Sequence, residues 1–259
     1  MRTSFLPALI GAMFLAGAAH AAEQTDSFLL PGLDMRSIEF KVGAWCRYQV
    51  VDEALGELDT SLVYLAVVGE EKTKTGRAYW LEVENTVPGG HDSDRDVARA
   101  LVDERIRTMA EGDSVYHYIS HFYTMKGNGP PEKGDSELLR RLTLISPAAP
   151  GDWKTESGRR VETPAGPFTC EYRSFDRSEA RDIPAGHVVL KQKRSDHVEV
   201  FTSSSVPLFH LVKSEIDRTR ESHAVPAIKG IPETGPRQSR TTSTLMAMGT
   251  GAKPMVPLP

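Results

Sequence analysis

Residues 62–86 read LVYLAVVGEEKTKTGRAYWLEVENT and predict a β-hairpin. The first part, residues 62–68, is apolar on both faces, which is typical of a strand covered on both sides. Residues 72–77 are polar, contain a glycine and predict the turn. Residues 78–86 alternate between apolar and polar side chains. This part of the chain is therefore predicted to be antiparallel sheet.

The period of two extends outward from this hairpin in both directions. It begins at residue 41, before the hairpin, and strands recur in the second half of the chain. Residues 224–238 are rich in proline and glycine and predict a long connection. We expect one antiparallel β-rich domain over residues 41–250. Its later strands are predicted at 159–163, 167–175, 186–194, 196–204, 208–217 and 239–248.

A helical insertion is expected in the middle of this domain, at about residues 94–125. Apolar residues recur near helical spacing over residues 94–111, and Gly112 ends the pattern. Residues 114–125 fit either class, because their apolar stripe is helical while their aromatic content suits a strand. The expected fold class is thus mainly β with an α-helical insertion (α+β).

The first 21 residues have the pattern of a cleaved signal peptide. Arg2 supplies a positive charge, an apolar run follows, and Ala19-His20-Ala21 places the cleavage before Ala22. The apolar run is short for a membrane anchor, so no transmembrane segment is expected in the mature chain. We therefore expect a periplasmic or secreted protein, with an extended lead-in at residues 22–40 and a proline-rich tail at 251–259.

The composition excludes several classes of protein. Of 259 residues, 39% are hydrophobic and 25% are charged, which argues against disordered, collagen-like and polytopic membrane chains. The formal net charge is −4, so no nucleic-acid partner is indicated.

Two cysteines, Cys46 and Cys170, lie in the predicted mature chain. Strand alternation places each on the apolar face of its segment, so both sulfurs are expected to point into the core. In an oxidising compartment such a pair predicts a structural disulfide. The alternative is two buried free thiols that act as small hydrophobic side chains.

No motif in the chain predicts catalysis, a metal site or a cofactor. His117 and His121 have the spacing of zinc ligands on a helix, but the glutamate of such a motif is missing. The serines at 203–205 lack the glycines of a nucleophile elbow. Glu82 and Glu84 share a strand face, and the simplest interpretation is a solvated sheet face. We therefore expect a protein that is not an enzyme.

Large apolar side chains are frequent on the predicted strand faces. In a strongly curved sheet, such a face is either filled by a helix or left open as a pocket for an acyl chain. An ordinary packed core is the alternative for each of these residues. The candidates to line a pocket are Tyr64, Tyr79, Phe168, Tyr172, Met246 and Met248.

Four segments together resemble a loose set of uncharacterised bacterial exported proteins: 43–48 (GAWCRY), 67–70 with 79–82 (VVGE, YWLE), 163–170 (TPAGPFTC) and 206–215 (VPLFHLVKSE). Their sheet is similar to that of the periplasmic lipoprotein carriers and outer-membrane lipoprotein receptors. This resemblance implies a strongly curved antiparallel sheet, or unclosed β-barrel, around a hydrophobic concavity. His210 stands where the resemblance leads us to expect a small residue, usually glycine.

Two functions follow as hypotheses. The first is an exported carrier or binding protein for a lipid, an acyl chain or another apolar ligand held in the concavity. The second is an interaction or structural module of the cell envelope. That module would bind a protein or glycan partner through its outer sheet face and an exposed Trp80.

Overall fold

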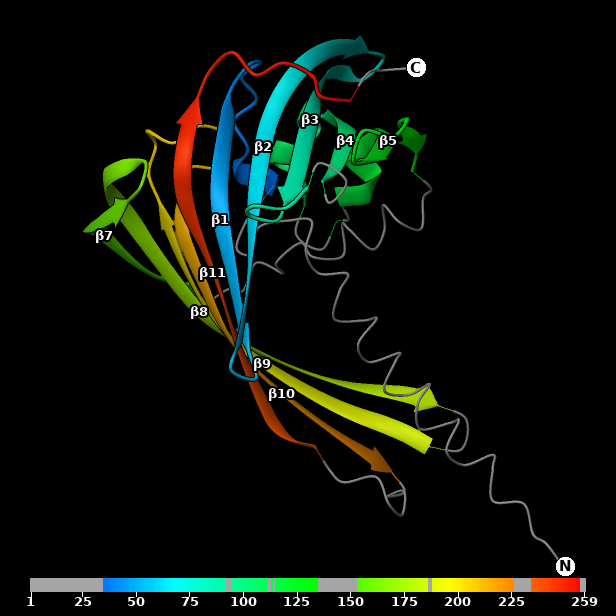
Figure 1. The fold of residues 1–259 in the computed structure, drawn as a ribbon, viewed down its shortest axis with the longest axis vertical. Coiled ribbons are helices and arrows are strands. Elements are labelled where there is room, and N and C mark those ends of the chain that lie inside the picture. Colours follow the sequence, from blue (N-terminus) through cyan, green and yellow to red (C-terminus); the bar gives the residue numbers. More distant parts are fainter. Residues whose placement is uncertain are drawn as a thin grey trace, which may run out of the picture.

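The computed structural model describes residues 35–91, 95–110, 113, 115–134, 153–185, 188–225 and 234–256. These residues form one antiparallel sheet of eleven strands, in the spatial order β6-β5-β4-β3-β2-β1-β11-β10-β9-β8-β7 (Figure 1). The strands are β1 (Trp45–Ala54), β2 (Glu57–Thr73), β3 (Gly76–Thr86), β4 (Asp96–Asp103), β5 (Ile119–Lys126), β6 (Glu132–Lys133), β7 (Lys154–Thr163), β8 (Gly166–Ala185), β9 (Val188–Thr202), β10 (Leu211–Val225) and β11 (Thr234–Gly249).

The prediction of a mainly β, antiparallel and unclosed fold is confirmed. The two edge strands of the described sheet are β6 and β7, and they do not pair with each other. β1 lies in the middle of the sheet, between its sequence neighbour β2 and the last strand β11. The hairpin predicted over residues 62–86 is confirmed as β2 paired with β3.

The predicted helical insertion at 94–125 is wrong, because the described residues of this segment contain no α-helix. They form strands β4 and β5, with short 3₁₀ helices η4 (Glu104–Thr108) and η5 (Val115–Tyr118) between them. The apolar residues of β4 are buried on both faces of the sheet, including Val97, Ala98, Leu101 and Val102. A strand covered on both sides loses its alternation, and here the remaining pattern imitates a helix.

Polar strands extend well beyond the predicted ends of the sheet. β7 pairs with β8 only as far as Ser174, and β1 pairs with β11 only as far as Ser239. The rest of β8 to β11 forms a four-stranded extension, visible in Figure 1, which we call the arm: residues 176–185, 188–197, 217–225 and 234–240. The two strands predicted at 186–194 and 196–204 are a single strand, β9.

One face of the sheet, the inner face, carries the main core. Alternate residues of each central strand point into it, as the period of two requires. Among the buried members are Cys46, Tyr48, Leu65, Tyr79, Leu81, Val198, Val200 and Leu245. The opposite, outer face is polar on β9 to β11.

Three segments of the chain fill the concavity of the inner face. Residues 35–40 bring Met35, Ile38 and Phe40, and the segment that contains η4 and η5 brings Ile106 and Val115. The loop 203–210 between β9 and β10 adds its own buried side chains: Val206, Leu208 and Phe209. The concavity therefore holds the protein's own apolar side chains.

The loop 203–210 adopts this position at a conformational cost. His210 has φ 59° and Leu208 has φ 68°, a left-handed conformation that costs a residue other than glycine roughly 1 kcal/mol. The left-handed backbone at His210 explains why a glycine is expected there. Backbone hydrogen bonds offset the cost: Glu39 N donates to Leu208 O at 2.7 Å, and Ser203 N donates to His210 O at 2.8 Å.

The segment that follows β11 crosses the outer face of β2 to β5. There the carboxylate of Glu82, which is fully buried, accepts hydrogen bonds from the backbone N–H groups of Met255 and Val256 at 2.9 and 3.1 Å. Arg99 donates to the Val256 carbonyl at 2.5 Å. The prediction of a solvated face at Glu82 is therefore wrong. Burial raises the pKa of this carboxyl, although the two N–H groups and Arg99 oppose the rise.

Trp80 is buried on this outer face, so the expectation of an exposed Trp80 is also wrong. Only 5% of the residue is accessible, and its indole N–H donates to Glu71 Oε1 at 2.7 Å. The guanidinium of Arg99 lies 4.6 Å from the centre of its ring. A partner cannot use Trp80 without first displacing these groups.

The predicted disulfide is contradicted, because Cys46 and Cys170 are both free and buried. Cys46 is on β1 and Cys170 is on β8, with β11, β10 and β9 between them in the sheet. The Cys46 thiol lies 3.4 Å from the carbonyl of Pro207, in the loop that fills the concavity. Each thiol acts as a small core side chain, which is the alternative interpretation of the sequence.

The signal peptide at 1–21, the lead-in from 22 to 34 and the last three residues of the tail lie outside the described residues. No helix in the described part of the chain has the length and hydropathy needed to cross a membrane.

Candidate functional site

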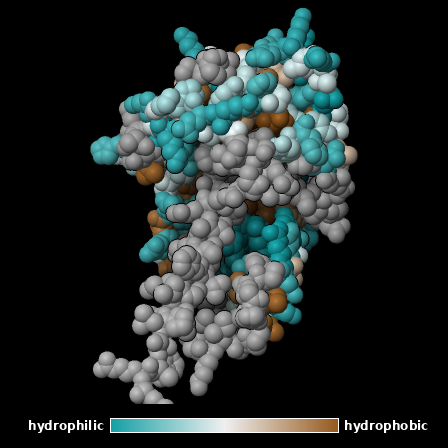
Figure 2. All heavy atoms as spheres, turned by 90° about the vertical axis from the view of Figure 1, so that its right-hand side faces the viewer, coloured by the Kyte–Doolittle hydropathy of each residue, from teal (hydrophilic) through white to brown (hydrophobic). Residues whose placement is uncertain are grey.

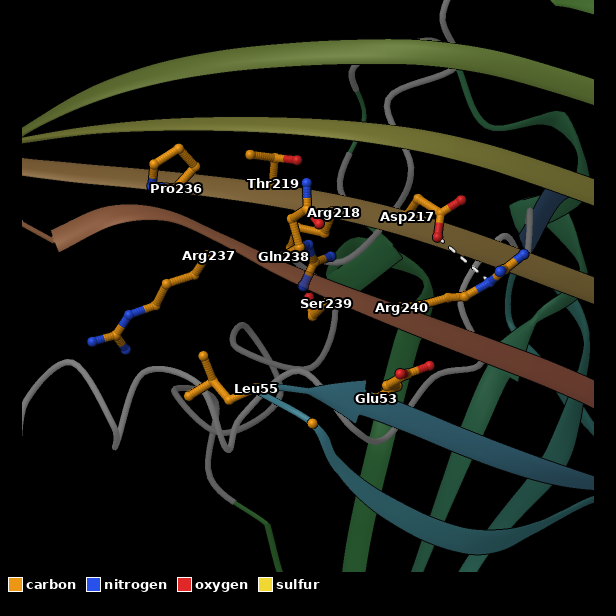
Figure 3. Close-up of a pocket in the computed structure, with 11 residues that line it drawn as sticks. Glu53, Leu55, Asp217, Arg218, Thr219, Pro236, Arg237, Gln238, Ser239 and Arg240 are labelled. Carbon is orange, nitrogen blue, oxygen red and sulfur yellow. Dashed lines mark ion pairs between the residues drawn. The ribbon is translucent and has the colours of Figure 1, made fainter.

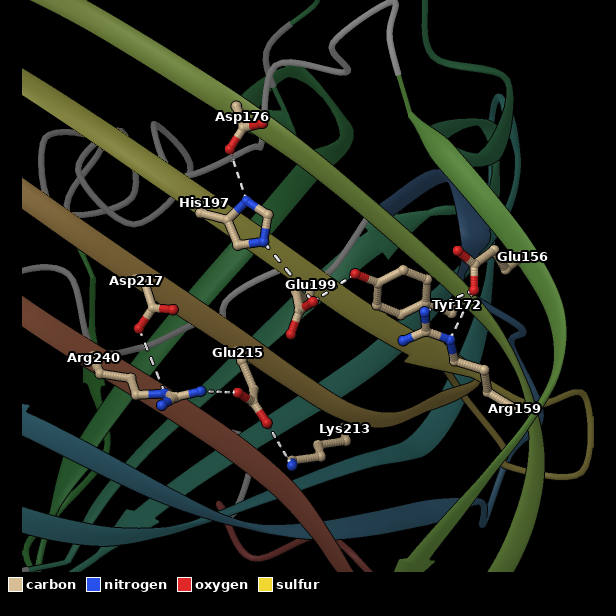
Figure 4. A network of polar contacts seen from close by, with 10 residues as sticks. All are labelled: Glu156, Arg159, Tyr172, Asp176, His197, Glu199, Lys213, Glu215, Asp217 and Arg240. Carbon is tan, nitrogen blue, oxygen red and sulfur yellow. Dashed lines mark hydrogen bonds and ion pairs between the residues drawn. The ribbon is translucent and has the colours of Figure 1, made fainter.

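The outer face of β8 to β11 carries a continuous set of charged and hydrogen-bonding side chains. We call it the outer network (Figure 4). Strand register places its members on the same face: Ser174 and Glu199 are opposite each other, as are Asp217 and Arg240. The network consists of Tyr172, Asp176, His197, Glu199, Lys213, Glu215, Asp217 and Arg240, and β7 contributes Glu156 and Arg159 at its border.

The first half of the network is centred on Glu199. Its carboxylate accepts a hydrogen bond of 2.5 Å from the Tyr172 hydroxyl and lies 3.8 Å from His197 Nε2. The other ring nitrogen of His197 is 2.7 Å from Asp176. Because Glu199 accepts the Tyr172 proton in a hydrogen bond, it raises the pKa of that hydroxyl. Tyr172 is therefore fixed as a donor, and Arg159 covers its ring at 3.7 Å from the centroid.

The second half is centred on Glu215. Lys213 Nζ lies 2.5 Å from one carboxylate oxygen, and the guanidinium of Arg240 binds the other. Arg240 also reaches Asp217 at 3.5 Å. Burial alone would raise the pKa of Glu215, but Lys213 and Arg240 outweigh it and hold the pKa below its ordinary value. Glu215 is therefore ionised at neutral pH.

Glu199 and Glu215 occupy directly opposite positions on β9 and β10. Two like charges in this arrangement repel, so each needs its own donors or cations to be stable. Tyr172 and His197 contact the carboxylate of Glu199. Lys213 and Arg240 form ion pairs with the carboxylate of Glu215. The result is a fixed array of acceptors and donors on the outer face, which can bind a polar partner by hydrogen bonds. The described network contains no paired nucleophile and base.

A pocket of about 610 Å³ opens beside this surface, where the β1–β2 hairpin ends against β11 (Figure 3). Its lining is mainly polar and comes from the hairpin, β10 and β11. The residues are Glu53, Leu55, Gly56, Asp217, Arg218, Thr219, Pro236, Arg237, Gln238, Ser239 and Arg240. An acyl chain would find few apolar contacts there.

The six residues predicted to line a ligand cavity are not brought together around this pocket. Tyr79 and Phe168 are in the core, and the Tyr79 ring stacks on Phe40 with centroids 4.5 Å apart. Tyr64 packs with Trp45 in a small cluster on the outer side of the sheet. Tyr172 belongs to the outer network. Their role in binding an apolar ligand stays a prediction.

The two methionines lie on β11 beside β1. Met248 is opposite Cys46 and packs partly against the core. Met246 is the extra residue where the register of β1 and β11 shifts, and it is half-buried. Neither residue lines the pocket of Figure 3.

The histidine pair does not form a metal site. His117 is in η5 and His121 is in β5, where its ring lies 6.3 Å from that of Trp80. Over the described ranges, no group of three or more histidine, cysteine or acidic side chains is placed to hold a metal ion.

Sequence reasoning missed the outer network, although its residues are plain in the sequence. Glu199, Glu215 and Arg240 come from three strands, and only the register brings them together. The alternation His197-Val198-Glu199-Val200 does indicate one polar face on β9. It does not indicate which polar residues of β10 lie opposite.

Comparison with known proteins found no protein-family model that matches the chain and no matching curated protein. Among solved structures, the chain is similar to one from Parabacteroides distasonis that is provisionally described as a lipoprotein. The identity is 13% and the TM-score 0.36, over 83% of this chain and 99% of that one. A provisionally described exported protein with a YmcC-like fold from Bacteroides fragilis is similar at 11% identity and TM-score 0.35, over 82% and 98%. Likenesses of this size do not establish a shared fold or function.

Proposed function

We propose that this protein is an exported interaction module of the cell envelope, which binds a protein or glycan partner through the outer face of its long strands. It acts by binding and not by catalysis. Export rests on the signal-peptide pattern of residues 1–21 and the cleavage expected before Ala22. A periplasmic or secreted location follows from that pattern.

One observation supports a binding surface over an internal cavity. The concavity of the sheet is filled by residues 35–40, by η4 and η5, and by the loop 203–210. Polar groups meanwhile cover the outer face of β8 to β11 as the ordered outer network. On the side of the molecule that is the right-hand side of Figure 1, the described surface is mostly hydrophilic, with hydrophobic residues scattered over it (Figure 2).

The carrier hypothesis needs an apolar space that a ligand can enter. The pocket beside the hairpin has a lining rich in arginine, carboxylate and amide groups, which suits a polar or charged ligand better than an acyl chain. Lipid carriage is therefore the second candidate function, and native mass spectrometry of the purified protein tests it.

Site-specific photo-crosslinking in intact cells tests the proposal. A photoreactive phenylalanine analogue replaces Lys193, which is exposed on the outer face of the arm, and in a control replaces Lys74, which is exposed in the β2–β3 turn. We expect one discrete adduct from position 193 that is absent from position 74. The adduct should weaken when Arg240→Gln disrupts the outer network.

Equal labelling at both positions, or no adduct at either, would contradict the proposal. Native mass spectrometry of the same protein distinguishes the lipid carrier from the interaction module. A lipid mass that co-purifies and is lost on denaturation would favour the carrier, and the bare mass of the chain would favour the module.

A further inference from the structure

The outer face of β2 to β5 carries a second binding arrangement, apart from the outer network. It holds the segment after β11, residues 250–256, which we call the strap and which is drawn in red in Figure 1. The carboxylate of Glu82 accepts hydrogen bonds from the N–H groups of Met255 and Val256 at 2.9 and 3.1 Å. Arg99 donates to the carbonyl oxygen of Val256 at 2.5 Å. Two side chains of the sheet therefore bind three main-chain groups of the strap.

These contacts recognise the backbone of the strap and little of its sequence. The chain bends at Met255 and Val256, and consecutive N–H groups in a bend can face a single carboxylate. Val256 is fully buried in a small cluster with Val97, whereas Lys253 and Pro254 are exposed. Another segment with the same bend, and with an apolar residue of similar size at its second position, would make the same contacts.

The two side chains that bind the strap form a buried ion pair. Arg99 Nη1 lies 3.7 Å from Glu82 Oε1, and the two side chains are 4% and 0% exposed. Such a pair adds little net stability, because the cost of removing both charges from water offsets their attraction. When the strap lifts, water solvates the charged groups that it covered, so the open site is not prohibitively costly. Polar contacts of this kind suit a segment that detaches and is replaced.

The strap leaves part of the site unused. Arg99 Nε is buried and has no hydrogen-bond partner among the described residues. A buried donor without an acceptor costs free energy. A segment that brings one more acceptor would therefore fit Arg99 better than the strap does.

The strap joins the sheet through glycines. Gly249 ends β11, and Gly251 follows in the left-handed region with φ 88°. Next to it, Ala252 N donates to Gly43 O at 2.9 Å. Because glycine adopts many backbone conformations, these two positions can absorb the rotation that lifts Met255 away from the sheet.

We propose that Glu82, Arg99 and Val97 form a peptide-binding site, which the strap occupies until a bent segment of a partner protein replaces it. The existence of the site does not depend on the function proposed above, whereas the identity of its occupant rests on that function. The site and the outer network lie on the outer face of the same sheet. A partner held by the outer network presents its segment at a high effective concentration, which offsets the advantage of the covalently attached strap.

A peptide with the sequence of residues 250–256 tests the site in vitro. It carries an N-terminal fluorophore and an amidated C-terminus, and fluorescence anisotropy measures its binding to the purified full chain. In the parent the attached strap competes with the peptide. Val256→Asp places a charge in the buried contact with Val97, so the strap detaches. We expect this variant to bind the peptide about tenfold more tightly than the parent does, or better.

Two changes distinguish the main-chain contacts from nonspecific binding. Methylation of the peptide nitrogens at the Met255 and Val256 positions removes the donors that Glu82 binds, and should weaken binding to the Val256→Asp variant about tenfold or more. Glu82→Gln, added to that variant, should act similarly because one acceptor oxygen is lost. Glu84→Gln is the matched control, since Glu84 lies two residues along the same face and pairs with Arg95. It should leave the binding unchanged.

Hydrogen exchange of the parent chain gives an independent answer if Val256→Asp fails to fold. We expect the amides of Met255 and Val256 to exchange about tenfold faster, or more, than the buried amide of Val67. The Val67 amide donates to Ala44 O at 3.0 Å in the core of the sheet. Faster exchange at the strap would show that it opens while the sheet stays folded.

Three results would overturn the proposal: Val256→Asp binds the peptide no better than the parent, methylation leaves the affinity unchanged, or the amides of the strap and of Val67 exchange at the same rate. A concentration-dependent dimer of the parent that Val256→Asp abolishes would also overturn it, and would assign the site to a second copy of the chain. Since these assays use purified protein and a synthetic peptide, their failure is distinct from the absence of a crosslinked partner in cells.

Discussion

The hydroxyl of Tyr48 on β1 donates a hydrogen bond of 2.9 Å to the backbone carbonyl of Leu211, the first residue of β10. Both residues are fully buried, with exposed fractions of 0% and 1%. Because β11 lies between β1 and β10 in the sheet, this bond spans the inner face across a whole strand. It holds the end of the loop 203–210 against the centre of the sheet.

We expect Tyr48→Phe to lower the free energy of unfolding by about 1–3 kcal/mol, because the buried carbonyl of Leu211 loses its donor and no water replaces it. Urea denaturation followed by tryptophan fluorescence measures the change. Tyr116→Phe, at a half-buried position of η5, should cost much less. Equal losses for the two variants would show that the bond to Leu211 contributes nothing specific.

Removing the charge of Glu82 should release the segment after β11. Glu82→Gln keeps the size of the side chain, but its amide has one acceptor oxygen where the carboxylate has two for the N–H groups of Met255 and Val256. We expect hydrogen exchange at these two amides to accelerate at least tenfold. Glu84→Gln, two residues along the same face and paired with Arg95, is the control and should leave them protected.

Both cysteines should titrate as free thiols in protein that has not been treated with a reductant. Protein from an oxidising compartment, denatured in guanidinium, should give two titratable thiols per chain, because Cys46 and Cys170 are free. In the folded protein at pH 8, Cys46 should react very slowly, since burial raises the pKa of its thiol to about 12. A denatured chain with no free thiol would show a disulfide and a different arrangement of β1 and β8.

The carboxylate of Asp103 should make stability depend on pH in acid. It accepts hydrogen bonds from Arg105, which hold its pKa at about 2, and it caps η4. A carboxyl whose pKa is lower in the folded chain stabilises it above the unfolded value, near 3.8, and loses that contribution as the pH falls towards 2. Asp103→Asn should therefore cost about 1 kcal/mol at pH 7 and less at each step from pH 4 to pH 2.

Thermal unfolding between pH 2 and pH 7 checks this prediction, with Glu104→Gln as the control at the neighbouring position. A constant difference between Asp103→Asn and the parent across this range would contradict it.

The hairpin at residues 62–86 could be predicted because its information is local. The apolar strand, the glycine turn and the alternating return are adjacent in the chain, and the structure pairs Thr73 with Gly76 as that pattern requires. The left-handed backbone at His210 also agrees with the glycine expected there. The hairpin depends on a few neighbouring residues, whereas the glycine at position 210 is expected from the resemblance.

The sequence of β4 imitates a helix because its burial depends on a distant segment. Val97 lies on the outer face, where it packs with Val256 and Met125. A strand whose outer face is solvated usually carries polar residues on that face and so alternates. β4 carries apolar residues on its outer face because the segment after β11 covers it. The sequence of residues 94–103 alone does not indicate that the segment after β11 covers them.

The candidate site could not be predicted for a related reason. The arm is polar on both faces, so hydrophobic periodicity is weak there and predicts strand ends too early, at 175 and 217, whereas β8 and β10 extend to Ala185 and Val225. The outer network around Glu199, Glu215 and Arg240 exists only once three strands have their register. A register is a property of the assembled sheet, and single segments do not encode it.

The position of β1 in the sheet affects how the chain can fold while it is being synthesised. Its partners are β2, which is made next, and β11, which is made last. Until β11 arrives, β1 and β10 both expose unpaired strand edges, and such edges readily pair with other chains. A polypeptide threaded through a translocon from its N-terminus cannot complete the middle of this sheet before translocation is nearly finished. In the export proposed above, the chain would therefore cross unfolded and would need shielding from its neighbours until the last strand, β11, pairs with β1 and β10.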